Sequence, residues 1–75
     1  MAKMFRVMIP QSMSPEESYE IFENFFDLGF DVYDHYHTIA PMQKRRDYFE
    51  AFWGDNSTPP LPEVPPNVQI IDLYP

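Results

Sequence analysis

The chain has 75 residues, a formal net charge of −7 and no cysteine. This length predicts a single domain over residues 1–75 with a modest core, and the lack of cysteine excludes disulfides and thiolate chemistry. The negative charge argues against direct binding of nucleic acid. No apolar run approaches the roughly 20 residues that span a bilayer, and no signal peptide is evident. A cytoplasmic location without a membrane partner is therefore expected.

The first two expected elements are a strand and a helix. Apolar and polar side chains alternate over residues 3–9, which predicts a strand. Ser14 is a suitable N-cap residue, and Glu17, three residues later, completes a capping box. Gly29 is a natural residue just after a helix end. A helix is therefore predicted between Ser14 and Gly29.

One side of the predicted helix is acidic. Carboxylates recur at i, i+4, i+7 and i+11, and no Lys or Arg occurs between residues 7 and 43. Like charges at this spacing destabilise a helix by roughly 0.2–0.5 kcal/mol per pair, so stability does not explain them. The acidic side comprises Glu16, Glu20, Glu23 and Asp27, flanked by Glu17.

The other side of the predicted helix is aromatic and is expected to face the sheet. Phe22 and Phe26 should pack beside Val7 and Ile9 of the first strand. The aromatic side comprises Tyr19, Phe22, Phe25 and Phe26, with Ile21 and Leu28 at its margin.

Three further strands are expected. Residues 30–39 are rich in β-forming side chains, and residues 45–53 fit a strand better than a helix because their charges oppose the helix dipole. These two segments are predicted to pair as a hairpin. Residues 58–66 contain five prolines and should form an extended linker. The last strand, 68–74, is apolar on both faces and is expected to be central or covered.

This order of elements predicts an α+β fold. A small antiparallel or mixed sheet of three to four strands should carry one amphipathic helix on one face, in the order β-α-β-β-β. The helix between the first two strands suggests a crossover connection. Half of a ferredoxin-like unit is a comparable architecture, and such an analogy carries no function.

The acidic side of the helix is the leading candidate for a functional site. It extends about 16 Å at 1.5 Å per residue, a distance along which one DNA strand places about five phosphates. The hypothesis is that the chain is a DNA-mimicking inhibitor that docks on a basic, nucleic-acid-binding protein. The candidate partner-binding residues are Glu16, Glu17, Glu20, Glu23, Asp27, Asp31 and Asp34.

An alternative function is capture of a small anionic ligand, such as a nucleotide, by associated copies of the chain. Arginine can hold a phosphate bidentately, and aromatic rings can stack on a base. Self-association into a homo-oligomer is also expected, because a small core and open sheet edges favour it. The candidate ligand-binding residues are Lys44, Arg45, Arg46, Tyr48 and Trp53.

Catalysis and metal binding have less support in the sequence. His35 and His37 would share a face of a strand with Asp31, a pattern seen at zinc sites. Two histidines are a weak signal, and no metal or cofactor is expected. No catalytic motif or glycine-rich phosphate loop is present, so a non-enzymatic protein is expected. In composition alone, the chain resembles phage-encoded inhibitors of host proteins, which are small, acidic, cysteine-free and rich in aromatics.

Overall fold

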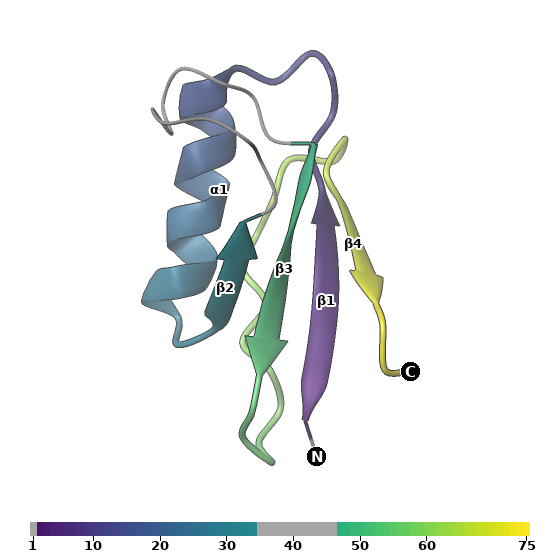
Figure 1. Cartoon of the computed structure of the whole chain (residues 1–75). Helices are drawn as coiled ribbons and strands as arrows, with labels where there is room; N and C mark the ends of the chain where they lie inside the picture. Colours follow the sequence, from purple (N-terminus) through teal and green to yellow (C-terminus); the bar gives the residue numbers. More distant parts are fainter. Residues whose placement is uncertain (1, 35–46) are drawn as a thin grey trace.

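Among the residues that the structure describes, four strands form one sheet, and a single helix packs on one of its faces (Figure 1). The computed structural model describes residues 2–34 and 47–75. The observed order β-α-β-β-β confirms the predicted α+β class. The elements are β1 (Lys3–Met8), α1 (Pro15–Asp27), β2 (Asp31–Asp34), β3 (Tyr48–Trp53) and β4 (Gln69–Asp72).

The sheet has the strand order β2-β3-β1-β4, and each neighbouring pair is antiparallel. β1 and β2 are therefore parallel to each other and separated by β3, so α1 forms the predicted crossover between them. β3 and β4 are likewise parallel and are joined by the proline-rich segment 58–66, which contains neither helix nor strand. This arrangement corresponds to a ferredoxin-like β-α-β-β-α-β unit in which an extended segment replaces the second helix. The correspondence concerns architecture alone.

The core lies between the sheet, α1 and the proline-rich segment. Phe25 of α1 is fully buried, and its ring contacts Phe30 and Phe49 edge-to-face, with centroids 5.2 and 5.5 Å away. Val64 of the proline-rich segment packs against the same core. The buried apolar residues are Phe5, Val7, Ile9, Met13, Ile21, Phe25, Phe30, Phe49, Ala51 and Val68.

The ends of α1 are as predicted. The Glu17 amide donates to Ser14 Oγ at 3.2 Å, and the Ser14 amide donates to Glu17 Oε1 at 3.0 Å, which completes the capping box. Gly29 follows the helix with a φ of +103°, a conformation that side chains with a Cβ rarely adopt. Local sequence therefore sets both ends of the helix.

The rotation of α1 about its axis differs from the prediction. Phe22 packs edge-to-face on Phe49 as expected, but Phe26 is 63% exposed, so its predicted packing beside the sheet is wrong. The buried face instead contains Ser18, Ile21 and Phe25. Ser18 can be buried because its hydroxyl donates to the Pro15 carbonyl at 2.8 Å. Leu28 is 40% exposed.

The predicted strands agree with the structure over the described residues, except in the position of the last one. β3 lies within the predicted strand 45–53 and pairs antiparallel with β2, as predicted, whereas residues 45 and 46 lie outside the described residues. The second predicted strand begins as expected, but 35–39 lies outside the described residues. β4 is an edge strand, so of the two predicted positions, central or covered, the central one is wrong. Ile70 packs against the core, whereas Ile71 lies half-buried on the opposite face of the sheet.

Candidate partner-binding surface

The acidic face of α1, defined by Glu16, Glu20, Glu23 and Asp27, points away from the sheet. All four residues are exposed, and the buried residues Ser18, Ile21 and Phe25 lie on the opposite side of the helix. The carboxylates extend about 16 Å along the helix axis at 1.5 Å per residue. The helix thus presents a line of negative charge directly to solvent.

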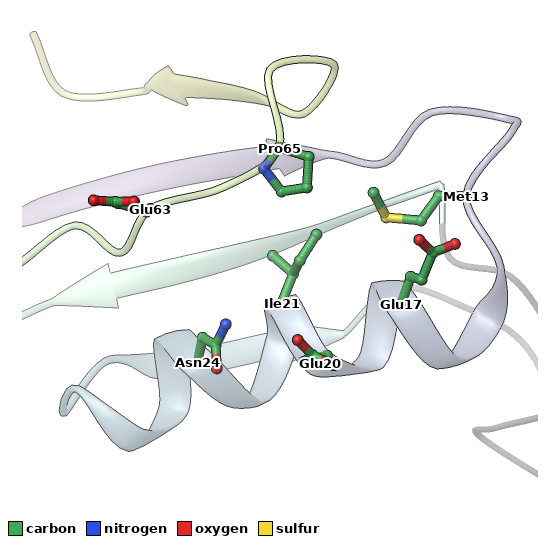
Figure 2. A pocket seen from close by; sticks show the side chains of 7 residues that line it. All are labelled: Met13, Glu17, Glu20, Ile21, Asn24, Glu63 and Pro65. Atoms are coloured by element: carbon green, nitrogen blue, oxygen red, sulfur yellow. The ribbon is translucent and has the colours of Figure 1, made fainter.

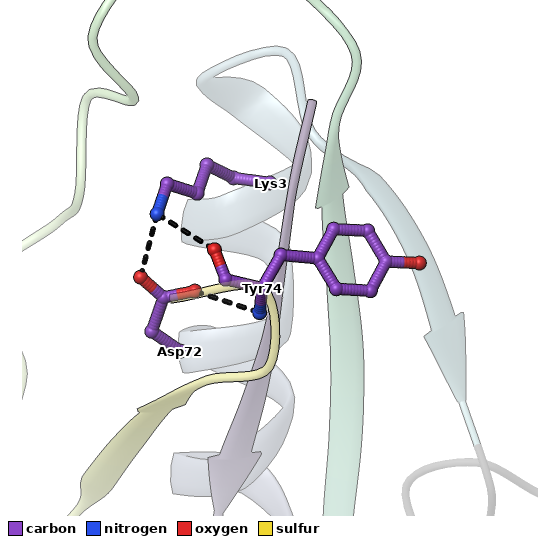
Figure 3. A network of polar contacts seen from close by, with 3 residues as sticks. All are labelled: Lys3, Asp72 and Tyr74. Atoms are coloured by element: carbon purple, nitrogen blue, oxygen red, sulfur yellow. Dashed lines mark hydrogen bonds and ion pairs between the residues drawn. The ribbon is translucent and has the colours of Figure 1, made fainter. Parts of the chain in front are cut away.

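Neither cation of the described ranges, 2–34 and 47–75, neutralises the acidic face. Lys3 Nζ forms an ion pair with Asp72 at 2.8 Å and also donates to the Tyr74 carbonyl at 2.9 Å (Figure 3). Arg6 forms an ion pair with Glu50 at 2.8 Å. The hydrogen bond that Lys3 donates to Asp72 is the main cause of a lowered pKa of the Asp72 carboxyl. Both cations therefore stabilise strand pairing in the sheet.

Glu17 has a structural role that sets it apart from the acidic face. Its carboxylate accepts the hydrogen bond from the Ser14 amide, and this bond lowers the pKa of Glu17 below its ordinary value. A negative charge at this end of the helix also interacts favourably with the helix dipole. Glu17 therefore holds the helix start in place while remaining exposed beside the acidic face.

A hollow of about 160 Å³ lies between α1 and the proline-rich segment (Figure 2). Its floor is apolar, because the nearly buried side chains of Met13 and Ile21 form it. Carboxylates from two elements distant in sequence surround it, so it borders the acidic face. The lining residues are Met13, Glu17, Glu20, Ile21, Asn24, Glu63 and Pro65.

Asp31, the first of the two aspartates that follow the helix, is not part of this line of charge. Asp31 is exposed, but it alternates with Val32, whose side chain packs against the core. Asp31 therefore lies on the sheet face opposite α1. The side chain of Asp34, the last residue of β2, lies outside the described part of the chain.

The alternative ligand-binding residues do not converge where the structure describes them. Lys44, Arg45 and Arg46 lie outside the described residues, as do His35 and His37 of the metal hypothesis. Tyr48 lies under the Arg6 guanidinium, 4.9 Å from its ring centroid, on the sheet face away from α1. Trp53 packs on Phe30 on the helix side and donates its indole N–H to the Ser57 carbonyl. One ligand cannot contact both rings within a single chain.

Two features of this surface were missed in the sequence. Phe26 is exposed beside Glu23 and Asp27, because the helix is rotated relative to the prediction. Glu63 reaches the hollow from the proline-rich segment, a tertiary contact that no local pattern signals. To predict the rotation of the helix, one would have to know that Ser18 is buried, and a serine gives no such indication in the sequence.

The chain matches no protein-family model, no curated protein and no solved structure. Within the described ranges, α1 is the single helix, and it lacks the length and apolar character needed to cross a membrane.

Proposed function

We propose that the protein is a small, non-enzymatic inhibitor that docks the acidic face of α1 on a basic, nucleic-acid-binding surface of another protein. The observation that carries this proposal is the exposure of Glu16, Glu20, Glu23 and Asp27 on one side of α1, opposite the core. Lys3 and Arg6, the two cations of residues 2–34 and 47–75, are engaged with other carboxylates. The acidic face thus has room for cations from a partner.

The spacing of the carboxylates supports a DNA-like recognition mode. Four carboxylates over about 16 Å compare with about five phosphates of one DNA strand over the same axial distance. A groove that binds a phosphate backbone through Lys and Arg would therefore meet a similar density of negative charge. Such charge complementarity mainly raises the association rate and specificity.

The hollow beside the acidic face supports a partner with long cationic side chains. Lys and Arg bury their aliphatic stems on apolar surface while keeping the charged head near solvent. Met13 and Ile21 would contact the stem, and Glu20 and Glu63 would lie near the head. The exposed ring of Phe26 would accept a partner's arginine guanidinium through a cation–π contact.

The proposal is tested by charge reversal on the acidic face. Tagged protein would be incubated with lysate at low and at high salt, and proteins released specifically by added duplex DNA would be identified by mass spectrometry. Glu20→Lys with Glu23→Lys should abolish that capture, since like charges would then meet across the interface. Capture should also weaken steeply with salt, because exposed charges are screened.

Asp31→Lys with Asp55→Lys is the matched control. Both residues are exposed and lie outside α1, and this pair changes the net charge by the same amount. The control should retain capture. Equal loss in the two double variants, each folded by circular dichroism, would show that net charge rather than the acidic face governs binding and would refute the proposal.

A further inference from the structure

The sheet face opposite α1 has the composition of a protein interface. It carries Arg6 and Glu50, which form an ion pair at its centre, surrounded by apolar and aromatic side chains. Tyr33 is 49% exposed, and the other surrounding residues are half-buried. Aromatic residues, Met and Arg are the types enriched at interfaces. The surrounding apolar and aromatic residues, which with the ion pair define the open sheet face, are Met4, Met8, Tyr33, Tyr48, Phe52 and Ile71; the exposed Asp31 and Gln69 lie on the same side at its rim.

The strand register divides the open sheet face into two unlike halves. β1 and β4 carry the aliphatic side chains and the cation Arg6, whereas β3 and β2 carry the aromatic side chains and the anion Glu50. The register places side chains of the two halves next to one another across the strands. Met4 lies beside Phe52, Met8 lies beside Tyr48, and Arg6 lies between Glu50 and Ile71, with Tyr33 beyond Glu50.

We infer that a second copy of the chain binds this open sheet face and forms a twofold dimer. A twofold axis parallel to the strands and between β1 and β3 would place β1 against the partner copy's β3, and β4 against its β2. Each aliphatic half then meets an aromatic half, and the Arg6 of one copy meets the Glu50 of the other. The face is therefore complementary to itself, which an isologous contact requires.

The contacts expected in this dimer are favourable ones. Met4 and Met8 would face aromatic rings, and sulfur–aromatic contacts are stabilising. Ile71 would face Tyr33 of the second copy. Charge also selects this side of the molecule, because Arg6 balances Glu50 at the centre and Asp31 lies at the rim, whereas two copies of the acidic face of α1 would repel each other.

The size of the face sets the expected strength of the dimer. β1 and β3 are six residues long, and β2 and β4 are four residues long. At about 4.8 Å between strands and about 3.3 Å per residue, the flat footprint is roughly 320 Å² per copy. The area buried on both copies is then roughly 650–800 Å², allowing for side-chain relief. This lies below the standard size of specific interfaces and in the range of weak ones, so dissociation in the upper micromolar range is expected.

Sedimentation velocity over a series of protein concentrations, from low to high micromolar, tests the inference. The unsubstituted protein should pass from monomer to dimer across this series. Tyr33→Lys should raise the dissociation constant at least about tenfold, since it places a charge in the interface. Phe26→Lys is the matched control, because Phe26 is also an exposed aromatic residue but lies on α1. It should leave the dimer unchanged.

Ile71→Lys provides a second test from the other half of the face, should Tyr33→Lys prevent folding as judged by circular dichroism. It should weaken the dimer to a similar extent. A monomer at every concentration would overturn the inference. So would a dimer that both face variants leave intact, since it would then be formed through a strand edge or through α1. Because the acidic face of α1 lies on the other side of the sheet, either result leaves the proposed docking function untouched.

Discussion

Truncation of Phe25 tests the packing of α1 most directly, because an adjacent phenylalanine serves as its control. Phe25 is fully buried, and its ring meets Phe30 and Phe49 edge-to-face. Phe26 is the next residue of the same helix and is 63% exposed. Sequence patterns alone placed both residues against the sheet, so the two substitutions separate the observed rotation of the helix from the predicted one.

The expected loss for Phe25→Ala follows from its contacts. Burial of a phenylalanine in a core makes its truncation cost about 3–5 kcal/mol, and two edge-to-face pairs of about 0.5–1.5 kcal/mol each favour the upper half of that range. The whole domain is expected to have about 4–11 kcal/mol of stability, from about 0.05–0.15 kcal/mol per residue. Phe25→Ala should therefore lower the Tm by at least about 15 °C, at about 4–8 °C per kcal/mol.

Urea and thermal unfolding followed by circular dichroism would measure both variants. Phe26→Ala should change the free energy of unfolding by less than about 0.5 kcal/mol, or raise it slightly, because alanine is the better helix former. Comparable losses in Phe25→Ala and Phe26→Ala would show that the helix is rotated differently from the structure and would refute the burial of Phe25 in preference to Phe26.

Two further predictions concern the ends of α1. Glu17 has a lowered pKa in the folded state, so its carboxylate should stabilise the fold at any pH above the ordinary glutamate pKa of about 4.3. This stabilisation should be lost as the pH falls through the lower pKa of the folded state. In urea unfolding, Glu17→Gln should therefore be less stable than the unsubstituted protein at pH 7, and the difference should vanish in acid. A difference that does not depend on pH would contradict the role of the charge. Gly29→Ala should cost about 1–2 kcal/mol of unfolding free energy, because it forces a Cβ into a left-handed conformation, 3.4 Å from the Trp53 ring. An unchanged urea midpoint would rule out that strain.

Features determined by neighbouring residues were predictable from the sequence. The capping box of Ser14 and Glu17 and the positive φ of Gly29 require only local geometry, and both are observed. Alternation along β1 likewise gave the correct inward face. The same alternation also bears on the ligand-binding alternative, which grouped Tyr48 with Trp53. Tyr48 and Trp53 are an odd number of residues apart on one strand, so their side chains must lie on opposite faces.

Features determined by tertiary packing were not predictable in this way. Several turns of α1 carry aromatic residues over a wide arc, and only close approach to the sheet selects Ser18 and Phe25 rather than Phe26 for burial. Ile70 and Ile71 made β4 resemble a central strand. Its place at the edge depends on pairing with β1, which no residue of β4 specifies alone. The acidic face was predictable because exposure needs no partner within the chain.

The extended segment 58–66 has a consequence for how the molecule opens. Five of its nine residues are prolines, which have no amide hydrogen, so this cover needs few hydrogen bonds of its own. α1 covers the other half of the core. Its backbone is held by a ladder of hydrogen bonds, which can open turn by turn from the helix ends. Hydrogen exchange would therefore record the opening of the helix in detail but would detect little of the segment beside it. The two elements that cover the core therefore open differently. α1 loses its hydrogen bonds stepwise, whereas the segment 58–66 can detach without breaking a series of backbone hydrogen bonds.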